Sequence, residues 1–125
     1  MANAKKGIEF SFKSTSVTYE QGASGGATTI NLEGTATGFG TVLGSLSFFA
    51  DAPGAQSGQT HWVGTAYLDD GAEVQGTSEG YWERSGKHKW RVRGVLRTSA
   101  GAMYLSDGVV SLDGRTYKGK LTEWE

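Results

Sequence analysis

The residues of this sequence that could do acid–base chemistry gather between His61 and Arg93. Two strands that turn back on each other near Gly86 would bring Glu79 close to Arg93, with His61 beside Glu79 on a third strand. A carboxyl and an imidazole can exchange protons with a substrate, and a neighbouring guanidinium can stabilise an oxyanion. The candidate catalytic residues are therefore Glu79, His61, Arg93, Tyr81 and Arg91.

The register of these strands follows from the loops that join them. We expect a three-residue loop at 85–87 and another at 69–71, with Gly71 in the bulge position. A slip of one residue would exchange the two faces of a strand, because side chains alternate between them. The predicted pairs are Trp82 with Trp90, Glu83 with Lys89, Tyr81 with Arg91, Glu79 with Arg93, and His61 with Glu79.

This register gives the three strands one polar and one apolar face, which allows two interpretations. If the polar face is the solvated exterior, its cross-strand ion pairs contribute roughly 0.2–1 kcal/mol each. If it lines an enclosed interior, the chemistry would be proton transfer without a cofactor, such as isomerisation, cyclisation or dehydration. We favour the exterior, because basic residues alternate along this face as on a solvated strand. The apolar face consists of Leu68, Ala66, Trp62, Val74, Trp82, Trp90 and Val92.

The aromatic residues suggest a binding site. Four tryptophans and five tyrosines accompany only 23 residues of Leu, Ile, Val and Phe. The rings either fill a core that is short of aliphatic side chains or wall a pocket for one hydrophobic or aromatic molecule. Glycines within the strands would leave volume for the pocket. The candidate ligand-binding residues are Trp62, Trp82, Trp90, Phe48 and Tyr67.

The sequence lacks the residues that several other classes of function require. The chain has no cysteine, and the spacing of His61 and His88 is not that of metal ligands, so we expect no metal and no cofactor. Twelve basic residues nearly balance 13 acidic ones, which argues against a nucleic-acid partner. No apolar run reaches the ~18 residues of a membrane-spanning helix, and none follows Lys5 and Lys6 as in a signal peptide. We therefore expect a cytoplasmic protein without a membrane partner.

Strands, and no helix, are what the hydrophobic pattern predicts. Alternating stretches of eight to twelve residues recur between turn residues, and short turns force antiparallel neighbours. The 125 residues predict one all-β domain, 1–125, a closed up-and-down barrel of about eight strands. Glycines inside the strands fit the sharp curvature of a small barrel. A two-sheet sandwich is the alternative, if the loop around Pro53 is a crossover.

Two segments of the sequence carry a resemblance: Gly34-Thr35-Ala36-Thr37-Gly38-Phe39-Gly40-Thr41-Val42 and the ending Arg115-Thr116-Tyr117-Lys118-Gly119-Lys120-Leu121-Thr122-Glu123-Trp124. They resemble small bacterial β-barrel proteins of the allene-oxide-cyclase-like and lipocalin-like (calycin) type. The Gly-x-Trp of lipocalins has no counterpart in Gly7-Ile8-Glu9. The resemblance implies a barrel that holds a ligand, or a cofactor-independent cyclase or isomerase built on one.

The stretch from Phe39 to Phe49 is apolar on both faces. Phe39, Leu43 and Phe49 alternate with Val42, Leu46 and Phe48, and only one of the two sets can fill the barrel. A second copy of the chain is the simplest cover for the other set. We therefore expect a homo-oligomer, and the alternative to ligand binding is an oligomeric structural protein without a ligand.

Overall fold

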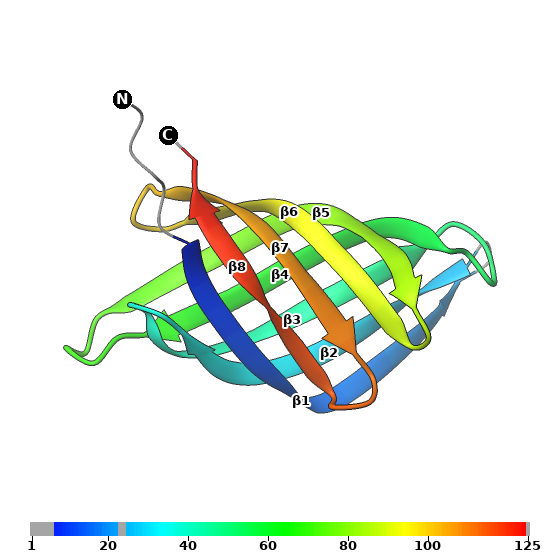
Figure 1. Ribbon diagram of the computed structural model, residues 1–125, viewed down its shortest axis with the longest axis horizontal. Helices are drawn as coiled ribbons and strands as arrows, with labels where there is room; N and C mark the ends of the chain where they lie inside the picture. The colour runs from blue at the N-terminus through cyan, green and yellow to red at the C-terminus, as the bar shows by residue number, and fades with distance from the viewer. Residues whose placement is uncertain (1–6, 23–24, 125) are drawn as a thin grey trace.

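The computed structural model describes residues 7–22 and 25–124, and the alternating pattern folds as eight strands (Figure 1). Residues 1–6, with the two lysines, and the centre of the turn expected at 22–26 lie outside the described residues. None of the described residues belongs to a helix that is long and apolar enough to cross a membrane. The strands are β1 (Gly7–Gly22), β2 (Gly25–Ala36), β3 (Gly40–Ala50), β4 (Ser57–Tyr67), β5 (Glu73–Gly86), β6 (Lys89–Thr98), β7 (Met103–Ser111) and β8 (Thr116–Glu123).

The strands form one closed antiparallel barrel in chain order. Each strand pairs with the next, and β8 closes the barrel on β1 through pairs such as Phe10 with Gly119. This confirms the up-and-down barrel. The sandwich is wrong, because the loop around Pro53 joins the neighbouring strands β3 and β4 and crosses no sheet.

Alternate side chains of every strand fill the interior. Phe10 and Phe12 stack with ring centroids 5.2 Å apart, and Tyr117 meets Phe10 edge-on at 4.9 Å. Leu46, 1 % exposed, is the most deeply buried large side chain. Phe39, grouped by alternation with Leu43 and Phe49, lies in the turn after β2 and packs edge-on against Tyr104 with ring centroids 6.1 Å apart. The grouping is wrong for Phe39, because the strand pattern does not extend into the turn.

Glycines occupy positions where strands approach closely on the inner face. Gly80 faces Gly94, and a Cβ on Gly80 would lie 2.9 Å from the Cα of Gly94, closer than real side chains permit. Elsewhere a ring uses the space, as at Gly64, where a Cβ would lie 2.6 Å from the Trp62 ring. Close approach of backbone accounts for Gly80, and a ring takes up the space at Gly64.

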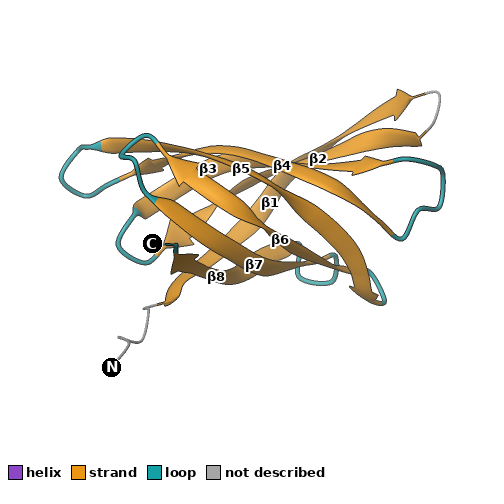
Figure 2. Ribbon diagram, turned by 90° about the horizontal axis from the view of Figure 1, so that it is seen from above, coloured by secondary structure: helices purple, strands orange, loops and turns teal. Residues whose placement is uncertain are grey.

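The two ends of the barrel differ. The turns at 37–39, 68–72 and 99–102 lie at the end near the chain termini. The loops at 51–56, 87–88 and 112–115 surround the other end, together with the hairpin of β1 and β2, which projects beyond the barrel (Figure 2). The projection arises because β1 pairs with β8 only as far as Lys13, whereas its pairing with β2 continues to Gly22. We call this second end the open end.

Candidate ligand-binding site

The predicted catalytic residues lie on the outer wall formed by β4, β5 and β6. Glu79 and Arg93 are exposed, and Tyr81 is 53 % exposed. His61 and Arg91 are half-buried on the outer surface. They share one face because their odd-numbered positions all point away from the inner-facing residues such as Trp82. The arrangement in which this face lines the interior is therefore wrong. Glu79 has no enclosed surroundings in which to act as acid or base.

The register of β5 and β6 differs by two residues from the predicted one. Tyr81 faces Arg93 and Trp82 faces Val92, so the predicted pairs Trp82–Trp90, Glu83–Lys89, Tyr81–Arg91 and Glu79–Arg93 are wrong. The cause is an irregularity between Arg84 and Gly86, followed by a turn so tight that Gly86 pairs with Lys89. A shift of two residues leaves the faces unchanged, which is why the face assignment is nevertheless right. The pairing of His61 with Glu79 is confirmed.

Two ion pairs between described residues lie on the outer wall. Arg91 donates to both carboxylate oxygens of Asp107, at 3.0 and 2.7 Å, and Arg93 donates to Glu83 at 2.7 Å. The hydrogen bond from Arg91 holds the pKa of Asp107 below its ordinary value. All four side chains are 42 % exposed or more, so water screens the pairs and they stabilise the fold little.

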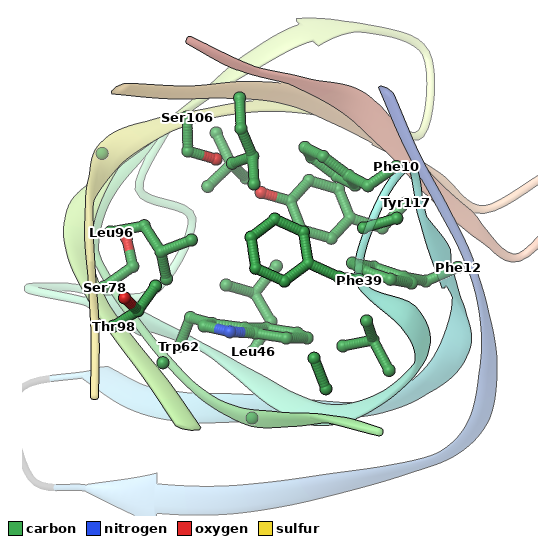
Figure 3. A pocket seen from close by; sticks show the side chains of 18 of the residues that line it. Phe10, Phe12, Phe39, Leu46, Trp62, Ser78, Leu96, Thr98, Ser106 and Tyr117 are labelled. Atoms are coloured by element: carbon green, nitrogen blue, oxygen red, sulfur yellow. The ribbon is translucent and has the colours of Figure 1, made fainter. Parts of the chain in front are cut away.

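The interior of the barrel holds a small cavity, with side chains directed into it from around the wall (Figure 3). Its volume is about 80 Å³, and Trp62 and Phe12 line it, stacked with centroids 5.5 Å apart. Burial raises the pKa of the Tyr117 hydroxyl to about 12, although a hydrogen bond with Ser106 opposes the rise. Because a cavity of ~150 Å³ is what benzene needs, this one is too small for an aromatic ligand.

The open end contains the larger hollow, a cleft of about 860 Å³. It shares no lining residue with the inner cavity. Trp82 forms part of its floor and is held there by a 2.8 Å hydrogen bond from its indole nitrogen to the carbonyl of Phe49. Phe48 meets Trp82 edge-on at 6.0 Å. The other apolar residues that line the cleft include Ile30, Leu32, Ala50, Pro53, Trp90, Val110 and Leu112.

The walls of the cleft carry two arginines. Arg84 faces Trp90 across β5 and β6, and its guanidinium carbon lies 5.5 Å from the centre of the Trp90 ring, a cation–π contact. Arg115 enters from the turn between β7 and β8. Neither forms an ion pair with a carboxylate of the residues that the structure describes. Glu20, on the projecting hairpin, is the one acidic residue among those that line the cleft.

The chain was compared with known proteins. No family model, no curated protein and no solved structure matches it. The resemblance to allene-oxide-cyclase-like and lipocalin-like barrels thus stays a prediction. The site must be judged by its geometry alone.

The predicted ligand-binding residues divide among three places. Phe48, Trp82 and Trp90 line the cleft at the open end. Trp62 lines the separate inner cavity. Tyr67 is 42 % exposed on the outer wall, because its odd-numbered position on β4 points outward. The single pocket expected between Trp62, Trp82, Trp90 and Phe48 is therefore wrong in extent, because Trp62 lies outside the cleft.

The sequence interpretation missed the arginines and the projecting hairpin. Arg84 shares the parity of Trp82, so the alternation along β5 already indicated an inward direction at the end of the strand. Arg115 gave no such signal, because it lies in a turn. Among residues 7–22 and 25–124, no three His, Asp or Glu side chains gather closely enough to hold a metal ion.

Proposed function

We propose that this protein binds one hydrophobic or aromatic small molecule in the cleft at the open end of the barrel. The observation that carries the proposal is the combination of the cleft's volume, about 860 Å³, with a lining of Trp82, Phe48 and Trp90. Small-molecule sites commonly measure ~300–1,000 Å³ and combine apolar walls with a few polar groups. Trp82 is fixed by its bond to the Phe49 carbonyl, so part of the site is formed before a ligand arrives.

Ligand titration with matched variants tests the proposal. N-phenyl-1-naphthylamine, a neutral aromatic compound that fluoresces in apolar surroundings, serves as the probe. Trp90→Ala removes a ring from the cleft and is expected to weaken binding about tenfold. Tyr67→Ala removes a ring from the outer wall and is expected to leave affinity unchanged. Equal affinities for the parent and both variants, or no binding to the parent, would refute the proposal.

The other functions expected from the sequence have weaker support. A cofactor-independent isomerase or cyclase would need its acid and base together in an enclosed site, and the residues predicted for that role are on the outer wall. The homo-oligomer keeps one supporting observation: Leu43 and Val63 are 46 % and 48 % exposed on neighbouring strands. Sedimentation at high concentration tests it, and a monomer of 13.3 kDa would count against it. The cytoplasmic location stays a prediction.

A further inference from the structure

Arg84 and Arg115 differ from Arg91 and Arg93 in having no carboxylate partner among the described residues. Arg91 and Arg93 each hold a carboxylate at 2.7 Å on the outer wall. Arg84 and Arg115 line the cleft, and no carboxylate of a described residue lies within ion-pair distance of either. Both side chains are exposed at the cleft, so their N–H groups that have no protein partner donate to water.

The position of Arg84 is fixed by its neighbours. Arg84 is opposite Trp90 in the ladder of β5 and β6, and its guanidinium carbon lies over the Trp90 ring, 5.5 Å from the ring centre. A guanidinium in such a cation–π contact keeps N–H donors that can bind a further group. These donors suit a carboxylate or a sulfonate, which can accept two of them at once.

The backbone of Arg115 has an unfavourable conformation. Its φ is 51°, in the left-handed region that glycine and asparagine adopt more readily than arginine. Its amide donates to the carbonyl of Leu112 at 3.2 Å, and its carbonyl accepts from the amide of Ser14 at 2.9 Å, so the turn is held in place. An arginine where glycine would be less strained is accounted for if its side chain has a use.

We propose that the ligand of the cleft is an amphipathic anion, with an apolar or aromatic body against Trp82 and Phe48 and one carboxylate or sulfonate group between Arg84 and Arg115. This rests on the proposed function, since it adds the charge of the ligand to the site. Two cations against the single carboxylate of Glu20 give the cleft a positive balance. A negative group would therefore replace water as the acceptor of the guanidinium N–H groups, in charge-assisted hydrogen bonds.

Two probes with the same aromatic rings separate the contribution of the negative charge to affinity from that of the apolar body. 1-Anilinonaphthalene-8-sulfonate carries a sulfonate that N-phenyl-1-naphthylamine lacks. The parent is expected to bind the sulfonate more tightly, and Arg84→Gln and Arg115→Gln are each expected to weaken its binding about tenfold. The neutral compound is expected to bind all three proteins within a factor of about two. Arg84→Lys, which keeps a positive charge, is expected to recover part of the lost affinity.

The outcomes distinguish this proposal from the proposed function. If both probes lose affinity equally, the arginines only pack against the ligand and the anion proposal fails while the cleft remains a binding site. If neither probe binds the parent, the proposed function itself fails. If a variant unfolds, the salt dependence of binding to the parent protein tests the proposal instead. The affinity for the sulfonate must fall as ionic strength rises, and the affinity for the neutral probe must stay unchanged.

An anionic lipid surface offers the arginines the same negative groups as an amphipathic small molecule. A further measurement distinguishes the two. Vesicles of anionic phosphatidylglycerol are sedimented with the parent protein, and the two probes are titrated below their aggregation concentrations. Binding of monomeric sulfonate without sedimentation of the protein supports the proposal. Arginine-dependent sedimentation with vesicles, together with no binding of the monomeric sulfonate, overturns it.

Discussion

Two arginines of the outer wall, Arg91 and Arg93, and two at the open end, Arg84 and Arg115, have different neighbours, although water reaches all four. Arg91 and Arg93 lie on the outer face of β6, each within 2.7 Å of a carboxylate and in contact with water. Arg84 lies on the inner face of β5 against Trp90. Arg91 and Arg93 thus lie beside carboxylates, whereas Arg84 lies beside an aromatic ring. The proposed site is the cleft with its two arginines, rather than the denser group of charges on the outer wall.

The largest effect is expected from a pair of leucines on β3 that tests the assignment of inner and outer faces. Leu46 is 1 % exposed inside the barrel and Leu43 is 46 % exposed outside it. Leu46→Ala is expected to lower the free energy of unfolding by about 2–5 kcal/mol, because it leaves a cavity. Leu43→Ala should cost less than about 1 kcal/mol. Denaturant titration measures both, and similar losses would break the comparison between the two faces.

The stability of the protein at alkaline pH tests whether water reaches the Tyr117 hydroxyl inside the barrel. Because burial raises the pKa of Tyr117 to about 12 from an ordinary value of 10.0, the folded protein keeps this proton where the unfolded chain loses it. The stabilisation is complete below pH 10 and is lost as pH rises from 10 to 12. The loss should be about 2–3 kcal/mol.

Tyr117→Phe is the control for this titration. It has no proton to lose, so its stability should fall less steeply over the same pH range. Equal slopes in the parent and in Tyr117→Phe would mean that the hydroxyl is hydrated in the folded state.

Arg115→Gly separates stability from binding at the open end. Relief of the left-handed backbone should exceed the entropy cost of glycine, so the variant is expected to be more stable by about 0.5–1 kcal/mol. The same variant should bind the naphthalene sulfonate about tenfold more weakly. Thermal unfolding and fluorescence titration check the two effects. A variant that is less stable, with unchanged binding, would give the side chain a purely structural role.

The smallest effects are expected on the outer wall. Glu83→Gln breaks an exposed ion pair and should cost less than about 1 kcal/mol. Glu79→Gln, which interrupts no ion pair with a described residue, should change the free energy of unfolding by less than about 0.5 kcal/mol. Thermal unfolding measures both. A cost of several kcal/mol for Glu79→Gln would place this carboxylate in buried surroundings and restore it as a candidate acid or base.

Much of the fold could be predicted from the pattern of residues. Alternation and turn spacing gave the eight strands, the barrel and the inward direction of Trp62, Trp82 and Trp90. The register of β5 and β6 could not be obtained, because it depends on one extra residue near Ser85 that has no distinct sequence signal. The division of the tryptophans between two cavities depends on how side chains pack inside the barrel, which a one-dimensional pattern does not contain.

The central claim, ligand binding at the open end, is tested most directly by the indole N–H signals of the tryptophans in a ¹H–¹⁵N correlation spectrum. Trp82 and Trp90 line the cleft, Trp62 lines the inner cavity, and Trp124 is 49 % exposed near the opposite end. Titration with N-phenyl-1-naphthylamine is expected to shift the signals of Trp82 and Trp90 and to leave those of Trp62 and Trp124 in place. Shifts centred on Trp62, or no shift of any indole signal at saturating probe, would contradict the account.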